Sequence, residues 1–196
     1  MYDFANSAFA TSILAVIFNQ YFAQIVAFGA EGAAFNIFGG AFKIPGAALF
    51  NYAVALSMLL VVISAPALGA IADFSGLKKR FLGFFCLTGG ALTAAMYFIR
   101  AGDYVSGAIL FIAANYAFAG GNVFYNALLL EVAHPDDMGK VSGWGWGLGY
   151  LGGGLCLALN LLMLQQPAWF GIEGETPVYY IFPDRKSTRL NSSHYS

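Results

Sequence analysis

The side chains best suited to chemistry in this sequence are carboxamides and a carboxylate within or beside apolar stretches. Asn115, Asn122 and Asn126 are separated by seven and four residues, so they share one face of a helix. Asp3 and Asn6 fall on a single helical turn near the start of the chain. Such groups can line a path for a hydrophilic solute, or they can bond neighbouring helices to one another. The spacing leaves both interpretations open for Asn122 and Asn126.

The composition limits the kind of protein that can hold these groups. Of the 196 residues, 59% are hydrophobic and 10% are charged, whereas soluble domains carry roughly 25% charged residues. This balance argues against a soluble enzyme and against a disordered chain. Nine Lys and Arg against ten Asp and Glu give a net charge of -1, so nucleic acid is not an expected partner.

Five stretches of the chain contain no Asp, Glu, Lys or Arg, and each is long enough to cross a bilayer once. About 20 helical residues span ~30 Å of hydrocarbon. A membrane β-barrel would need polar residues at every second position, which these stretches lack. The sequence therefore predicts an all-α, multi-pass helix bundle in a lipid bilayer. The expected spans lie near residues 4–28, 48–72, 81–99, 105–130 and 141–164.

Basic residues in the short connections indicate the orientation, because Lys and Arg are enriched on the cytoplasmic side. The connection between the second and third spans holds three of them at residues 78–80, and the next connection on that side holds Lys140. Lys43 and Arg100 lie on the opposite side. This excess predicts a cytoplasmic N-terminus.

Few groups suited to catalysis or metal binding are present. Glu131, like Asp3, is a candidate for the solute path. Both are expected at the membrane edges, where carboxylates are mostly solvated or cap a helix, so proton transfer through them is the less favoured option. Cys86 and Cys156 lie in apolar runs, and His134 is the only histidine before the final residues. Neither a metal site nor a cofactor is predicted, and an enzyme is not expected.

Glycines recur on the fifth span in a pattern that favours close helix packing. Gly145, Gly149 and Gly153 are spaced by four residues, and small residues at this spacing let two helix backbones approach each other. Packing is the simplest role for them. The same face would also suit a membrane scaffold that binds partner helices without transporting anything, and this is the alternative function.

The connection between the second and third spans has a distinct pattern of small and charged residues. Gly69 would let helices approach closely, and Gly76 would permit a tight turn. Asp73 is placed where it could cap a following helical turn. Lys78 and Lys79 would anchor the loop at an anionic membrane face.

This pattern resembles the signature loop of the major facilitator superfamily, G-x-L-A-D-R-x-G-R-K. The matching residues are Gly69, Ala72, Asp73, Gly76 and Lys78. Phe74 and Leu77 stand where that family usually has basic residues. The resemblance implies that Asp73 is the acidic member of a conformational latch, with Lys78 or Lys79 as its basic partner.

Segments 2–9, 124–131 and 139–153 look like the branch of that superfamily related to the autophagy-linked vacuolar amino-acid effluxers of fungi and their bacterial relatives. The resemblance covers residues 2–164. It implies a secondary transporter of small solutes, amino acids among them, that works by alternating access between two six-helix halves. Residues 1–183 would then hold five spans of the N-terminal half, in a bacterial inner membrane. The C-terminal half of the same protein would be its partner.

The last residues of the chain, 184–196, differ from the rest. They are polar and contain three of the nine basic residues. The segment resembles the in-frame translation of a common sequencing adapter, so we expect it not to be native.

Overall fold

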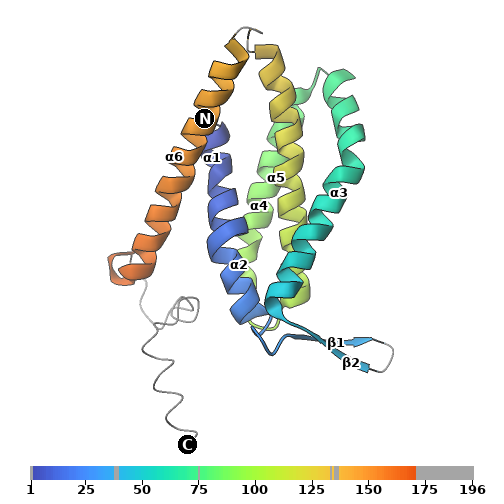
Figure 1. Ribbon diagram of the computed structural model, residues 1–196, viewed down its shortest axis with the longest axis vertical. Helices are drawn as coiled ribbons and strands as arrows, with labels where there is room; N and C mark the ends of the chain where they lie inside the picture. Colours follow the sequence, from blue (N-terminus) through green and yellow to red (C-terminus); the bar gives the residue numbers. More distant parts are fainter. Residues whose placement is uncertain (1, 38–39, 75, 133, 135–136, 171–196) are drawn as a thin grey trace, which may run out of the picture.

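The computed structural model describes residues 2–37, 40–74, 76–132, 134 and 137–170. Within this part of the chain, helical segments run side by side along one axis, and a short hairpin lies at one end (Figure 1). The expected bundle of residues 1–183 is described as far as residue 170, and the segment 184–196 lies outside the described residues.

Five helical segments of the described chain are long and apolar enough to cross a membrane: Tyr2–Val26, Gly46–Phe74, Lys78–Phe98, Tyr104–Glu131 and Met138–Met163. Each of them contains most of one predicted span. The prediction of an all-α, multi-pass bundle is therefore confirmed, and the protein is an integral membrane protein.

The elements have the following bounds. The first span is divided into α1 (Tyr2–Ala8), η1 (Phe9–Val16), α2 (Ile17–Tyr21) and η2 (Phe22–Val26). The remaining helices are α3 (Gly46–Phe74), α4 (Lys78–Ala95), η3 (Met96–Phe98), α5 (Tyr104–Val132), α6 (Met138–Gln165) and η5 (Pro167–Phe170). Both η1 and η2 are π-helical. Because a π turn takes more residues than an α turn, these segments rotate the side chains that follow them around the span.

A two-stranded hairpin between the first and second spans was not predicted. Strands β1 (Ala33–Ile37) and β2 (Gly40–Ile44) pair antiparallel, with Phe35 opposite Phe42. The Tyr104 hydroxyl donates a hydrogen bond of 2.5 Å to the carbonyl oxygen of Ala34, and the rings of Phe35 and Tyr104 meet edge to face. These contacts attach the hairpin to the start of α5.

An aromatic cluster fills the end of the bundle nearest the hairpin. Phe18, Phe22, Phe50 and Phe111 have ring centroids between 4.7 and 6.5 Å apart, and all four are buried. They come from α2, η2, α3 and α5, so the cluster joins the first span to two others. A second buried cluster, which includes Phe85 and Phe124, packs α4 against α5.

We predict that Phe111→Ala lowers the free energy of unfolding by about 2 kcal/mol, the cost of a cavity of roughly 100 Å³. The transfer term seen in soluble proteins largely disappears here because lipid is as apolar as the core. Unfolding in mixed detergent micelles, followed by circular dichroism, measures the change. Phe74→Ala is the control, because the Phe74 side chain is 91% exposed. Equal losses in the two variants would contradict the prediction.

Candidate functional site

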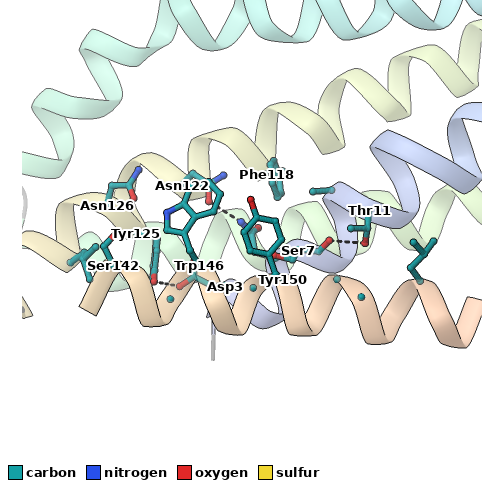
Figure 2. Close-up of a pocket in the computed structure, with 18 residues that line it drawn as sticks. Asp3, Ser7, Thr11, Phe118, Asn122, Tyr125, Asn126, Ser142, Trp146 and Tyr150 are labelled. Atoms are coloured by element: carbon teal, nitrogen blue, oxygen red, sulfur yellow. Dashed lines mark hydrogen bonds between the residues drawn. The ribbon is translucent and has the colours of Figure 1, made fainter. Parts of the chain in front are cut away.

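A cavity of about 590 Å³ lies between the first span and the facing sides of α5 and α6 (Figure 2). Its polar lining comes from all three. The first span contributes Asp3, Asn6, Ser7 and Thr11, α5 contributes Asn122, Tyr125 and Asn126, and α6 contributes Ser142, Trp146 and Tyr150. A lining of carboxamides, hydroxyls and one carboxylate can hydrogen-bond a hydrophilic solute.

Hydrogen bonds across this cavity connect the first turns of the first span to α5. Asn6 Nδ2 donates to Asn122 Oδ1 at 2.9 Å, and the Tyr2 hydroxyl donates to the same oxygen at 3.3 Å. The Tyr125 hydroxyl donates to the carboxylate of Asp3. The rings of Tyr2 and Tyr125 are stacked, with centroids 4.5 Å apart. The cavity wall is therefore an ordered network.

Asp3 lies about two helical turns inside the ends of α5 and α6, deeper in the bundle than its place at the start of the first span indicates. Tyr125 precedes the end of α5 at Val132 by seven residues, and Gly145, which also lies against Asp3, follows the start of α6 at Met138 by seven. Seven helical residues rise ~10 Å. In Figure 1 the start of α1 is accordingly recessed below the neighbouring ends of α5 and α6. The edge position was expected because the residue is near the start of its span, but the offset between helices places it about two turns deep.

The glycines of α6 face the first span. A side chain at any of the three predicted positions would collide with it. An added Cβ would lie 2.7 Å from Asp3 Oδ2 at Gly145, 2.9 Å from Ser7 Oγ at Gly149 and 2.9 Å from Thr11 Cγ2 at Gly153. The absence of a side chain at these positions brings the two backbones together and makes room for the Asp3 carboxylate.

The three asparagines of α5 do not act together. Asn122 and Asn126 line the cavity, whereas Asn115 is fully buried and donates through Nδ2 to Ser57 Oγ on α3 at 2.7 Å. Asn115 Oδ1 has no partner among the described residues. Seven residues shift Asn115 by ~10 Å along the helix axis, to a depth where α3 covers that face. Asn115 therefore has the interhelical role, outside the cavity.

An ion pair joins the start of α4 to the last turn of α5. Lys78 Nζ contacts Glu131 Oε1, and the two side chains are 12% and 57% exposed. Glu131 lies outside the cavity lining. Among the described residues no ion pair is found for Asp73 or Lys79, which are both exposed. Within the described chain, Lys78 is thus paired with Glu131 of α5. The resemblance had implied a pairing of Asp73 with Lys78 or Lys79.

The loop glycines and Asp73 are also placed differently from the expectation. A Cβ added at Gly69 or Gly76 would meet nothing within 4 Å, so neither glycine is in close contact with another helix in the part of the chain that the structure describes. Asp73 belongs to the last turn of α3, and the N-cap residue of α4 is Leu77. Asp73 is therefore not the cap of the following helix.

Sequence reasoning missed the aromatic residues of the cavity. Tyr125 holds the carboxylate of Asp3, and Trp146 and Tyr150 form part of the wall. Aromatic residues in an apolar helix are ordinarily read as core or lipid-facing groups. Spacing could have indicated them. Tyr125 follows Asn122 by three residues and Tyr150 follows Trp146 by four, so the members of each pair lie on the same face of a helix.

A second, more apolar cavity of about 460 Å³ lies between the first span, α4, α5 and α6. Asn160 Nδ2 donates to Ser12 Oγ at 2.7 Å, and Ser12 Oγ lies 3.3 Å from Cys156 Sγ. Cys86 also lines this cavity. Among the described residues there is no group of three or more His, Cys, Asp or Glu that could hold a metal ion.

The fold and the first cavity define a multi-pass helical membrane protein with a polar cavity, and a carboxylate in it, between its spans. The family model described as "Vacuole effluxer Atg22 like" matches residues 1–138. The match covers more than half of the chain, and the protein belongs to this family.

Relatives are found in bacteria and in a fungus. The chain is 31% identical to the "Uncharacterized MFS-type transporter YxiO" of Bacillus subtilis over 164 residues, which are 84% of this chain and 36% of the relative. It is 30% identical to "Autophagy-related protein 22" of Neurospora crassa over 95 residues, 48% of this chain and 13% of the relative. The chain thus spans about a third or less of these relatives. No solved structure shows a significant match.

We predict that Gly149→Ala destabilises the bundle by roughly 1–3 kcal/mol, the usual cost of overpacking. The added methyl would lie 2.9 Å from Ser7 Oγ and 3.5 Å from the carbonyl oxygen of Asp3. Gly147→Ala is a matched control on the same helix, because nothing lies within 4 Å of that position. The free energy of unfolding in mixed micelles distinguishes the two. A loss at Gly147 equal to that at Gly149 would refute the packing role.

A double-mutant cycle tests the ion pair between α4 and α5. We expect Lys78→Met and Glu131→Gln to show a coupling free energy of about 1 kcal/mol, since one side chain is mostly buried and the other is half-exposed. The same cycle on Lys140 and Asp137, whose side chains are 79% and 55% exposed, serves as the control and should give a smaller value. A coupling of zero for the first pair would show that it contributes nothing.

Proposed function

We propose that this chain is part of a secondary transporter that moves small hydrophilic solutes by alternating access, and that the polar cavity is part of the solute path. The observation that carries this proposal is the depth of the cavity lining. Asp3 and Asn6 of the first span face α5 inside the bundle, where they bond Tyr125 and Asn122. Polar groups at such positions are costly and usually serve a function. The family membership and the name of the Bacillus subtilis relative support the same conclusion.

A second half of the same protein completes the path in this proposal. The chain spans 36% of the Bacillus subtilis relative, which leaves room for a second bundle of similar size. The aromatic side of the cavity is open, with Trp146 and Tyr150 67% and 74% exposed. In transporters built from two repeats, the solute site lies where the halves meet. The open side is where we place the C-terminal half.

The loop after α3 acts as a latch between the halves in this proposal. Asp73 and Lys79 are exposed and free of ion pairs within the described chain, so both are accessible to a second half. Lys78 instead fixes α4 to α5 through Glu131. The loop would face the cytoplasm, on the side of the N-terminus, in a bacterial inner membrane. Amino acids are the first solutes to test, in the efflux direction.

The alternative of a membrane scaffold has less support. A scaffold would need the glycine face of α6 to receive a partner helix. Gly145, Gly149 and Gly153 already face the first span of the same chain. A latch loop would also have no purpose in a scaffold.

Transport by the full-length protein that carries this chain is the direct test. We expect Asn122→Ala to reduce the transport rate about tenfold, because it removes a cavity amide and the acceptor that orients Asn6, and a hydrogen bond of this kind contributes roughly 1.4 kcal/mol. Counterflow of labelled amino acids in proteoliposomes measures the rate. Asn160→Ala is the control, since Asn160 bonds the first span to α6 from the second cavity, and it should stay within about twofold.

Two results would count against the proposal. Wild-type protein that moves no solute from a broad panel would remove the transporter assignment. Equal rates for wild type and Asn122→Ala, with solute transported, would remove the cavity from the path.

A further inference from the structure

We propose that Asp3 binds a primary ammonium group of the solute, with the Trp146 and Tyr150 rings as the neighbouring wall. The inference rests on the proposed function, because it names the chemical class of solute that the same cavity takes. It assigns Asp3 as the group that touches the solute and Tyr125 as the residue that positions Asp3.

The first argument is charge. Asp3 carries the only formal charge among the described residues that line the cavity. Two basic side chains of α4 and α6 are engaged elsewhere, Lys78 with Glu131 and Lys140 with Asp137. A carboxylate about two turns inside the bundle gains strongly from a positive partner because the surroundings have a low dielectric constant. Within the described chain no cation fills that position, which leaves the carboxylate available to a cationic group of the solute.

The second argument is the unused hydrogen-bonding capacity of the carboxylate. A carboxylate can accept about four hydrogen bonds, and the described residues give Asp3 one side-chain donor, the Tyr125 hydroxyl. An ammonium group offers three donors on a single positive charge. Since the Tyr125 hydroxyl occupies one acceptor site of the carboxylate, the remaining acceptor sites are left for a group in the cavity.

The third argument is the aromatic wall. The rings of Trp146 and Tyr150 have centroids 6.0 Å apart and are tilted by 41°. Figure 2 shows both rings projecting from α6 into the space between α6 and α5, on the side where Asp3 and Ser7 lie. An aromatic face attracts an organic cation and packs against the carbon atoms that carry it. A carboxylate beside two rings is suited to an ammonium group on a carbon chain.

The amides complete the solute's surroundings. Asn122 Oδ1 accepts bonds from Asn6 and Tyr2, so Asn122 Nδ2 remains as a donor, and Asn126 lies one turn further along α5. These N–H groups can bind an acceptor, such as a carbonyl, on the same solute. A divalent metal ion is a poorer fit, because the described residues offer no group of three His, Cys, Asp or Glu.

Binding of two matched probes to the full-length protein in lipid nanodiscs tests this assignment. L-phenylalaninamide carries a primary ammonium group, and 3-phenylpropanamide has the same skeleton without it. We expect calorimetry to show at least tenfold tighter binding of the ammonium probe to the wild type, since a bond between charged groups contributes more than a neutral one. Asp3→Asn should abolish this preference and leave the affinity for 3-phenylpropanamide unchanged. Asp137→Asn, which removes a carboxylate outside the cavity, should keep the preference.

Tyr125→Phe provides a second variant in case Asp3→Asn does not fold. It keeps the carboxylate but removes its hydrogen-bond donor, so the preference for the ammonium probe should fall severalfold while 3-phenylpropanamide binds as before. A structural role alone would weaken both probes together. Size-exclusion chromatography and circular dichroism establish that each variant is folded.

Three results would overturn the inference. These are equal affinity of the wild type for both probes, an unchanged preference in folded Asp3→Asn, and competitive displacement of the ammonium probe by sodium chloride but not by choline chloride. The binding measurement does not depend on turnover. If the preference is lost with Asp3 while no solute is transported, the ammonium site stands and the proposed function fails. If solutes are transported and the wild type shows no preference between the probes, the proposed function stands and the ammonium site fails.

Discussion

The close contact between the first span and the glycine face of α6 is the interaction on which the cavity depends. Lipid gives helices no hydrophobic reason to associate, so packing and polar contacts must hold them together. Gly145, Gly149 and Gly153 remove the side chains that would separate the backbones. Because that contact sets the depth of α1 relative to α6, it also places Asp3 beside Gly145, inside the bundle and next to Tyr125. The position of the polar site thus follows from the close packing of the first span against these glycines.

The sequence predicts the membrane spans best, because a charged side chain inside the bilayer costs free energy. All five spans follow from long runs of sequence without ionised side chains, which border on or lie between the charged residues and leave little freedom to the fold. The hairpin is different, because a short pair of strands held to Tyr104 carries only a weak local signal.

The site was only partly predictable because it depends on offsets between helices. Spacing along one helix places Asn122 and Asn126 on a common face, and both line the cavity. It says nothing about which neighbour covers that face at each depth, so Asn115 could not be separated from them. The same limit applies to Asp3, and to the pairing of Lys78 with Glu131, which lie 53 residues apart in the chain. Both depend on how far one helix is displaced along another.

The two ends of the first span are held in different ways. Near the hairpin, Phe18 and Phe22 join the aromatic cluster with Phe111, a dry contact that loses packing if the helices separate. At the other end, the contact of the first span with α5 includes hydrogen bonds of Asn6 and Asp3 beside the stacked rings of Tyr2 and Tyr125. Hydrogen bonds can be exchanged for bonds to water or solute at little net cost. The first span is thus held by dry aromatic packing near the hairpin, and beside the cavity partly by hydrogen bonds that water can replace.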